Sequence, residues 1–259
     1  MKIDTPQFNL MHRACMKASK ILIRDFGEIE KLQILEKGPG DFVTASDKKV
    51  EKVIINELLI TGYSILSEES GLIDGKNPNK RWVIDPIDGT TYFSNGLSHF
   101  AISIGYEENK EIISGVIFDP IKNEMFMAHK GLGSYLNNSR IRVSNKSDIK
   151  NSMLVTGGPR YLNKTKEKIF SEYEKISKSI YVPIRKSGSA ALDLAYVAAG
   201  RYDGMWQRDL NYWDVAAGII IIKESGGFIN NLKSEDFFTG KLDIIASNTK
   251  IYDDLSKFL

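Results

Sequence analysis

Apolar residues recur at intervals of three and four near the start of the chain, and this spacing predicts an amphipathic helix over residues 6–26. The same spacing predicts a second helix over residues 47–59, after an irregular loop at Gly38-Pro39-Gly40. Short apolar runs predict strands at residues 65–67 and 83–84. The apolar positions of the two helices are Phe8, Met11, Cys15, Ala18, Leu22 and Phe26, followed by Val50, Val53, Ile54 and Leu58.

The pattern changes in the middle of the chain. Between residues 99 and 143, apolar runs of strand type alternate with turn residues, which predicts an antiparallel meander. Beyond this region, strand-like and helix-like stretches alternate. The expected strands of the meander are 100–106, 112–118, 124–129 and 133–136. The later expected elements are strands at 152–156, 181–184, 203–207, 228–230 and 243–246, and helices at 161–177, 189–199, 214–225 and 248–258.

These elements predict a mixed fold of the α+β / α/β class in two halves. Residues 1–148 are expected to form an α+β half with the antiparallel sheet, and residues 149–259 an α/β half. At 259 residues the chain is long enough to bury a substantial core, either as one large domain or as two modest ones.

The charge balance limits the classes of partner. Lys and Arg total 35 and Asp and Glu total 33, so a net charge of +2 provides no field that would recruit nucleic acid or an anionic membrane. The single cysteine, Cys15, excludes an intramolecular disulfide and a cysteine-based metal site. The charged N-terminal residues are unlike a signal peptide, and no apolar run has the length of a membrane span. We therefore expect a cytoplasmic protein without a membrane or nucleic-acid partner.

Two aspartates carry the strongest chemical signal. Asp85 and Asp88 follow a strand-like run and enclose Pro86, whose φ angle is fixed. Gly89 allows a sharp turn, so both carboxylates are expected to leave the end of the strand and point into the same space. Carboxylates in close proximity repel each other unless a proton or a cation lies between them. A simple turn is the alternative interpretation, because Asp and Gly favour turns for local reasons.

A phosphate-binding segment is expected directly after these aspartates. The hydroxyl groups of Thr90 and Thr91, together with the backbone N–H groups that follow Gly89, are suited to a phosphate group. Carboxylates beside such a segment favour Mg²⁺, which binds hard oxygen ligands and bridges to phosphate oxygens. The pattern therefore predicts Mg²⁺ and a phosphoester at this position.

Several separated segments resemble the inositol monophosphatase family, which belongs to the Mg²⁺-dependent, lithium-sensitive phosphatases. The segments are Lys37 to Asp47, Glu68-Glu69-Ser70, Asp85 to Thr91, Gly115 to Pro120, Gly188 to Ala191, Trp213 to Gly218 and Glu224 to Gly227. They occur in the family's order and extend over essentially the whole chain. The resemblance implies a layered α-β-α-β-α sandwich, a homodimer and hydrolysis of a small phosphate ester, with inositol 1-phosphate as the expected substrate.

The resemblance also implies a set of oxygen ligands for two Mg²⁺ ions. The ligands are Glu68, Asp85 and the Ile87 carbonyl for the first ion, and Asp85, Asp88 and Asp214 for the second. Lys37 and Asp41 are expected to help position a third, weaker ion together with Glu68. Two ions that share one carboxylate would activate a water and stabilise both the attacking and the leaving oxygen. For Asp214, at the start of a predicted helix, a helix cap is the alternative role and is compatible with metal binding.

In the same way, the resemblance pairs Asp47 with Thr90 as a proton relay. Asp47 would orient Thr90, and the Thr90 hydroxyl would accept a proton from the activated water. Taken from its sequence position alone, Asp47 would be the N-cap of the helix that follows.

Contacts to the leaving group are expected from the second half. Gly188, Ser189 and Ala190 open a predicted helix, whose backbone N–H groups can meet hydroxyl groups of the alcohol. Gln207 stands where the family usually has a Glu that contacts the ring, and Tyr92 stands where it has Asn. A neutral amide still accepts a hydrogen bond from a hydroxyl group. These two departures leave the metal ligands and hydrolysis intact and bear on the identity of the alcohol.

Two other functions remain open. One is a different sugar phosphatase or a histidinol phosphatase of the same fold. The other is a non-enzymatic role in which the chain binds RNA polymerase or ribosomal RNA factors, as some bacterial homologues do. The balanced charge and the complete set of metal ligands weigh against this second role as the sole function.

Overall fold

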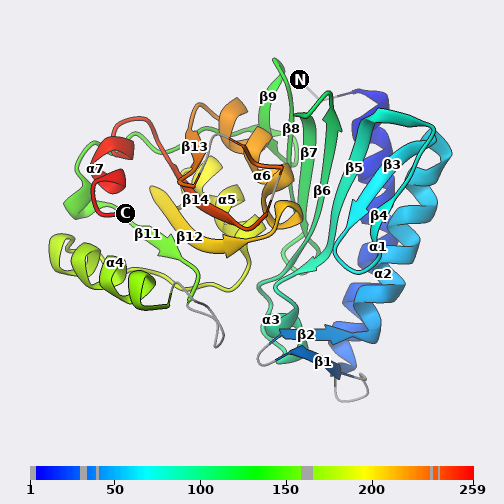
Figure 1. The fold of residues 1–259 in the computed structure, drawn as a ribbon, viewed down its shortest axis with the longest axis horizontal. Helices are drawn as coiled ribbons and strands as arrows, with labels where there is room; N and C mark the ends of the chain where they lie inside the picture. The colour runs from blue at the N-terminus through cyan, green and yellow to red at the C-terminus, as the bar shows by residue number, and fades with distance from the viewer. Residues whose placement is uncertain (1–3, 30–33, 39–40, 159–165, 234–235, 239) are drawn as a thin grey trace.

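Two β-sheets alternate with three layers of helices, as a computed structural model of the chain shows (Figure 1). The structure describes residues 4–29, 34–38, 41–158, 166–233, 236–238 and 240–259. Helices α1 (Pro6–Gly27) and α2 (Ala45–Leu58) cover the outer face of the larger sheet. Helices α5 (Ala190–Ala198) and α6 (Tyr212–Glu224) lie between the two sheets.

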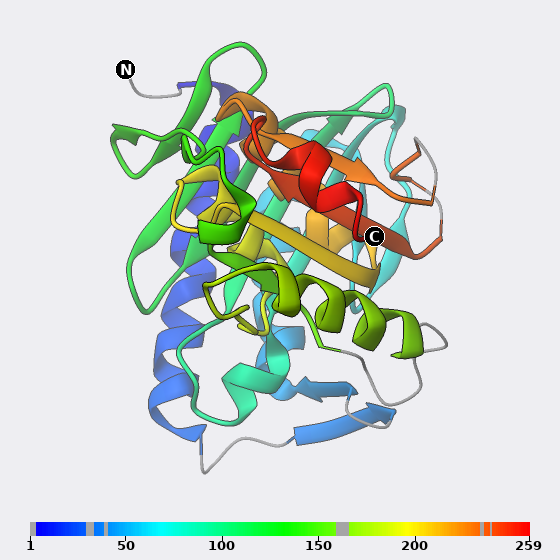
Figure 2. The ribbon, with the colours of Figure 1, turned by 90° about the vertical axis from the view of Figure 1, so that its left-hand side faces the viewer.

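The third helical layer covers the outer face of the smaller sheet. It consists of α4 (Lys166–Ser179) and α7 (Tyr252–Ser256), which lie in front of that sheet in Figure 2. The predicted α-β-α-β-α sandwich is therefore confirmed. None of the helices in the described part of the chain is long and apolar enough to cross a membrane.

The larger sheet has eight strands in the order β10-β9-β8-β7-β6-β5-β3-β4. Strands β3 and β5 pair in parallel, and all other neighbours pair antiparallel. The predicted meander corresponds to β6 through β9. The strand bounds are β3 (Tyr63–Ser67), β4 (Gly71–Ile73), β5 (Asn77–Asp88), β6 (Ala101–Glu108), β7 (Glu111–Asp119), β8 (Glu124–His129), β9 (Gly133–Leu136) and β10 (Ser139–Arg140).

The smaller sheet has four strands in the order β11-β12-β14-β13. It is a mixed sheet, because β11 and β12 are parallel and the other two pairs are antiparallel. Its strands are β11 (Leu154–Thr156), β12 (Gly204–Leu210), β13 (Phe228–Asn231) and β14 (Leu242–Ser247). A separate antiparallel pair, β1 (Ile34–Gly38) and β2 (Asp41–Thr44), lies next to the short helix α3 (Thr90–Ser94).

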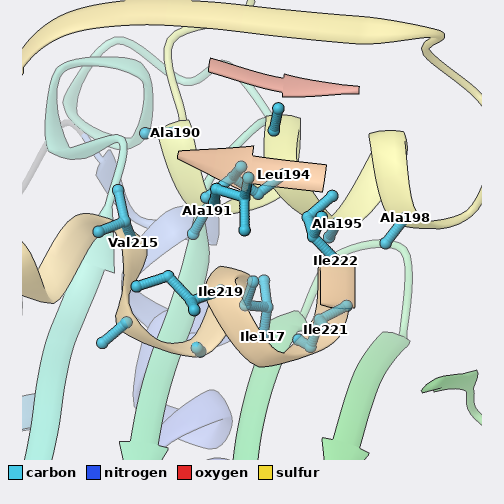
Figure 3. Packing of buried hydrophobic residues seen from close by; sticks show 14 of the residues in the cluster. Ile117, Ala190, Ala191, Leu194, Ala195, Ala198, Val215, Ile219, Ile221 and Ile222 are labelled. Atoms are coloured by element: carbon cyan, nitrogen blue, oxygen red, sulfur yellow. The ribbon is translucent and has the colours of Figure 1, made fainter. Parts of the chain in front are cut away.

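Residues 215–222 of α6 are apolar or small and are all buried, as expected for a helix enclosed between two sheets. Its residues Ile219, Ile221 and Ile222 pack with Leu194 of α5 in one buried cluster (Figure 3). The contact with the larger sheet is so close that a Cβ atom at Gly115 of β7 would lie 2.8 Å from a backbone oxygen of α6. This cluster contains residues of both predicted halves, and the domain boundary at residue 148 stays a prediction.

Two secondary-structure predictions are wrong. Residues 181–184 do not form a strand, since Pro183 lacks an N–H group and a single isolated bridge joins Val155 to Arg185. The predicted loop at Gly38-Pro39-Gly40 is not tested, because residues 39–40 lie outside the described residues; the strands β1 and β2 on either side of it were not predicted. The last helix begins at Tyr252 rather than at residue 248, because the side chain of Asn248 accepts hydrogen bonds from the backbone N–H groups of residues 250 and 251 and closes a turn.

A buried ion-pair network ties β12 to its neighbours. Arg208 donates from Nη1 to Asp243 Oδ2 at 2.9 Å and from Nε to Glu172 Oε2 at 3.2 Å. All three side chains are at most 5% exposed. A buried carboxylate is strongly destabilising once its cation is removed.

Arg208→Met is therefore expected to lower the free energy of unfolding by about 3 kcal/mol, the lower end of the usual range because Lys233 also contacts Asp243. Urea denaturation of the variant and the wild type measures this difference. Lys178→Met is the matched control, because its pair with Glu174 is exposed to solvent and contributes little to stability. Equal midpoints for Arg208→Met and the wild type would show that the network does not stabilise the fold.

Candidate active site

Asp85 and Asp88 both belong to β5, and an irregularity in this strand brings them together. Asp85 pairs with Ser103 of β6 and Asp88 with Ala101, so β5 contains one extra residue between the two pairs. Side chains three residues apart in a regular strand point to opposite faces, whereas an inserted residue restores a common face. The expectation that the two aspartates leave the end of the strand is wrong, because β5 extends to Asp88. The bulge, rather than the end of the strand, turns the side chains of Asp85 and Asp88 to the same face.

Four carboxylates lie close to one another around this bulge. Burial raises the pKa of Asp85 well above its ordinary value, and the charges of Glu68, Asp88 and Asp214 raise it further. Glu68 follows β3, and its backbone N–H donates to the carbonyl of Ile84, directly before Asp85, at 3.2 Å. Asp214 comes from the first turn of α6. The structure thus brings together the four acidic residues that were predicted as metal ligands.

The chemistry of this group fits a hard divalent cation. Asp85 is 1% exposed and has neighbours of its own charge, an arrangement that a proton or a cation stabilises. Carboxylate and carbonyl oxygens are the ligands that Mg²⁺ prefers. Within the described residues, no three His, Cys, Asp or Glu side chains stand in the geometry of a finished metal site. Metal binding by these four residues and by the Ile87 carbonyl therefore stays a prediction.

Asp88 is held by the N-terminus of α5. Its Oδ2 atom accepts hydrogen bonds from Ser189 Oγ and from the backbone N–H of Ala191, both at 2.6 Å. Burial raises the pKa of Asp88 to about 6, although these hydrogen bonds favour the ionised form. Ser189 was predicted as a substrate contact, and the structure shows that its hydroxyl group already has a partner in Asp88. The predicted contacts of Gly188, Ser189 and Ala190 with the leaving group stay untested.

Asp47 and Thr90 are in contact. Thr90 Oγ1 lies 3.2 Å from Asp47 Oδ1 and 2.9 Å from the carbonyl oxygen of Ile87, so two acceptors are available for one hydroxyl proton. Asp47 Oδ2 accepts from the backbone N–H and the hydroxyl of Thr44, both at 2.7 Å. Burial raises the pKa of Asp47 to about 6. The N-cap of α2 is Thr44 rather than Asp47, and Asp47 completes the capping box from the third helical position while it also contacts Thr90.

Asp214 likewise has a capping contact. Its Oδ2 atom accepts the backbone N–H of Asn211 at 2.7 Å, and the two residues form the capping box of α6. The cap that we considered as an alternative role is present. A cap uses one carboxylate oxygen in this way and does not exclude metal binding by Asp214.

The residues expected to bind the phosphate and the alcohol differ in position and in exposure to solvent. Gly89 has a φ of +99° and precedes α3, and Thr91 is exposed. Gln207 lies within β12 and is half-buried, with its side-chain amide against Gly157, where an added Cβ atom would lie 2.3 Å from the amide carbon. Lys37 and Asp41 belong to β1 and β2, but their side chains lie outside the residues whose side chains are described.

No sequence motif pointed to one further residue, Glu51 of α2, which is 5% exposed. Its Oε1 atom accepts the backbone N–H groups of Glu69 and Ser70 at 3.2 and 2.9 Å, and its Oε2 atom accepts Ser70 Oγ at 2.6 Å. Three hydrogen bonds to one carboxylate fix the turn that directly follows Glu68. Glu51 lies four residues after Asp47, so α2 supports the site at two points.

Glu51→Gln is expected to weaken Mg²⁺ binding by about 10- to 100-fold, which is usual for a residue that holds a metal ligand in place. The amide retains one acceptor oxygen and presents an NH₂ group to donors that require an acceptor. Calorimetric titration of Mg²⁺ into chelator-treated protein measures the change. Glu57→Gln is the matched control on the same helix, because Glu57 pairs with Arg13 and Lys17 instead. Equal affinities for both variants would exclude this role of Glu51.

Comparisons with known proteins identify the family of this chain. The profile of the inositol monophosphatase family matches residues 6–257. The inositol-1-monophosphatase of Mesorhizobium japonicum is 39% identical over 251 residues, which cover 96% of this chain and 94% of that protein. The Nus factor SuhB of Xylella fastidiosa is 40% identical over 268 residues, which cover 99% of this chain and 95% of that protein.

A solved structure has the same fold over nearly its whole length. The extragenic suppressor protein SuhB from Bartonella henselae superposes with a TM-score of 0.93 at 41% identity, and the match covers 98% of each chain. The layered sandwich, the group of buried carboxylates and the match over residues 6–257 lead to one conclusion: this chain belongs to the inositol monophosphatase family.

Proposed function

We propose that this chain is a Mg²⁺-dependent phosphomonoesterase that hydrolyses inositol 1-phosphate, or a related polyol phosphate, to the alcohol and phosphate. Phosphatase activity and metal dependence are properties of the family, whereas the ion, the number of ions and the alcohol are the proposed part. The observation that carries the proposal is the buried carboxylate group around Asp85 with the Asp47–Thr90 contact beside it.

The metal ligands in this proposal are Glu68, Asp85, Asp88, Asp214 and the carbonyl oxygen of Ile87. They would hold two Mg²⁺ ions, and Lys37 and Asp41 would help to hold a third. Bound Mg²⁺ supplies positive charge to the phosphate oxygens and lowers the pKa of water at the site.

The Asp47–Thr90 pair handles the proton of the attacking water. When the Thr90 hydroxyl donates its proton to Asp47 Oδ1, 3.2 Å away, its lone pairs can accept a hydrogen bond from the water. As the water oxygen forms its bond to phosphorus, one water proton moves to Thr90 and the Thr90 proton moves to Asp47. The ester P–O bond breaks, and the leaving alkoxide takes a proton from solvent to give the free alcohol.

A panel of phosphate esters tests this function. Phosphate release in Mg²⁺ would be measured from inositol 1-phosphate, histidinol phosphate, fructose 1,6-bisphosphate and a nucleotide. We expect the highest kcat/KM for inositol 1-phosphate. A higher kcat/KM for one of the other esters would identify that ester as the preferred substrate and leave the proposed reaction unchanged. An absence of phosphate release from every ester would overturn the proposal.

Gln207→Glu is expected to tighten binding of inositol 1-phosphate by about 1 kcal/mol with kcat nearly unchanged, because a carboxylate accepts stronger hydrogen bonds from hydroxyl groups than an amide does. The readout is a lower KM for inositol 1-phosphate across the panel. Gln7→Glu, on α1, controls for the added charge. An unaltered substrate profile would remove Gln207 from the account of specificity without affecting the reaction class.

A second candidate function comes from the relatives named Nus factor SuhB, at 36–40% identity. It is binding to RNA polymerase or ribosomal RNA factors, in addition to catalysis or in its place. Co-purification of RNA polymerase with a catalytically inactive Asp88→Asn variant would support it. We also propose a homodimer, which light scattering coupled to gel filtration would test.

A further inference from the structure

A second group of polar side chains, centred on the buried Asp193, lies near the carboxylate cluster. Asp193 of α5 is 1% exposed, and its Oδ1 atom accepts a hydrogen bond from Ser187 Oγ. His99 Nε2 lies 3.9 Å from the same oxygen. Among the described residues, neither Asp193 Oδ2 nor His99 Nε2 has a hydrogen-bond partner. The reaction proposed above uses none of these three residues.

The geometry excludes a nucleophilic serine. A serine nucleophile needs a histidine that accepts its proton and a carboxylate that orients the histidine. Here Ser187 donates directly to Asp193, and burial lowers the pKa of His99 to about 4. Ser187 is therefore held by the Asp193 carboxyl group. The role of this pair depends on the backbone segment that Ser187 belongs to.

Ser187 begins the turn that leads into α5. Gly188, the next residue, has a φ of +93°, and Ser189 is the N-cap, whose Oγ atom accepts the backbone N–H of Leu192 at 3.2 Å. Asp193 lies in the first turn of the helix and reaches back to Ser187. The Asp193–Ser187 contact therefore closes this turn from within the protein.

The same turn also contacts an aromatic ring. An added Cβ atom at Gly188 would lie 1.9 Å from the ring of Tyr92, so the two residues are in direct contact. Tyr92 in turn meets His99 edge to face, with 6.3 Å between ring centroids. The turn thus contacts Tyr92 at Gly188 and Asp193 at Ser187.

The turn presents two donors to a proposed metal ligand. Ser189 Oγ and the backbone N–H of Ala191 both contact Asp88 Oδ2 at 2.6 Å. A rotation of residues 187–189 would remove both hydrogen bonds from a buried carboxylate. The position of Asp88 therefore depends on the conformation of the turn.

We propose that Asp193 is a positioning residue of the active site: by accepting the Ser187 hydroxyl, it fixes the turn whose Ser189 and Ala191 hold Asp88 ready for a cation. This inference rests on the proposed function of Asp88 as a metal ligand. Positioning partners of metal ligands typically change metal affinity by about 10- to 100-fold when they are removed.

Four variants test the proposal through Mg²⁺ affinity, measured by calorimetry on chelator-treated protein. Asp193→Leu and Ser187→Ala each remove one partner, and both are expected to weaken Mg²⁺ binding by about 10- to 100-fold. Asp193→Asn keeps an acceptor oxygen for Ser187 and is expected to bind Mg²⁺ nearly as the wild type does. Ser177→Ala, on the outer helix α4, is the matched serine control and is expected to have no effect.

The outcomes separate this role from a structural one. Asp193 could stabilise α5 through its negative charge near the helix N-terminus; in that case Asp193→Asn would behave like Asp193→Leu, and the proposal would be overturned. Wild-type affinity in Ser187→Ala would also overturn it, and this variant remains informative if Asp193→Leu does not fold. If the wild type binds Mg²⁺ but releases no phosphate, the proposed function fails, while the affinities still decide the role of Asp193.

Discussion

Replacing Thr90 with alanine is expected to lower kcat by about 10²–10⁴-fold, the usual contribution of a positioned group that transfers a proton. Thr90 Oγ1 is the atom that links Asp47 to the attacking water. The alanine substitution removes this atom and leaves every carboxylate side chain in the protein. KM should change much less than kcat, because the hydroxyl acts mainly in the transition state. Steady-state kinetics of phosphate release measures both parameters.

Two further variants make this test specific. Asp47→Asn should reduce kcat to a similar extent, and the double variant should be clearly less impaired than the product of the two single effects, because both residues act in one relay. Thr90→Ser keeps the hydroxyl group and should retain most of the activity. If both single variants kept a kcat near that of the wild type, the assignment of the pair would be wrong.

Asp88→Asn is expected to reduce turnover by about a hundredfold or more, since it replaces a proposed metal ligand with a neutral amide. The amide oxygen can still accept the hydrogen bonds of Ser189 and Ala191, so the fold should persist. Kinetics at saturating Mg²⁺ measures the loss. Turnover equal to that of the wild type would exclude Asp88 as a ligand that the reaction requires.

The same variant should change how the stability of the metal-free protein depends on pH. Burial raises the pKa of Asp88 to about 6, so the folded state binds more protons than the unfolded state between the ordinary carboxyl pKa and this value. The free energy of unfolding therefore falls as the pH rises from about 4 to about 6. Asp88→Asn lacks this ionisation, and its stability should fall less over the same range. Thermal melts in chelator at pH 4, 5 and 6 provide the comparison.

The parts of the fold that follow from local pattern were predictable. The apolar spacing in residues 6–26 and 47–59 predicts α1 and α2 nearly to the residue, because each helix has one face on the larger sheet. The strand expected at residues 181–184 fails because Tyr181 and Val182 resemble a strand locally, while Pro183 prevents regular pairing. The hairpin β1–β2 was missed because a Gly-Pro-Gly sequence indicates a turn without indicating paired strands on both sides.

For the candidate site, the sequence indicated which acidic residues belong to it but not how the fold brings them together. The order of motifs identified the carboxylates, but neither composition nor spacing could reveal the extra residue in β5 that turns Asp85 and Asp88 to one face. The supporting residues Glu51 and Asp193 were missed for a similar reason. Glu51 acts on residues 18 and 19 positions away, and the turn that Asp193 fixes acts on Asp88 about a hundred residues earlier, so tertiary contacts alone define their roles.

We propose that the carboxylate group around Asp85 holds the cations on which phosphate release depends. The most direct measurement is phosphate release from inositol 1-phosphate by wild-type protein in EDTA, followed by addition of Mg²⁺ in excess of the chelator. We expect no release above the uncatalysed rate in EDTA and full recovery of activity with Mg²⁺, with little recovery in Asp85→Asn. Undiminished release in EDTA, or equal recovery in Asp85→Asn, would contradict the account.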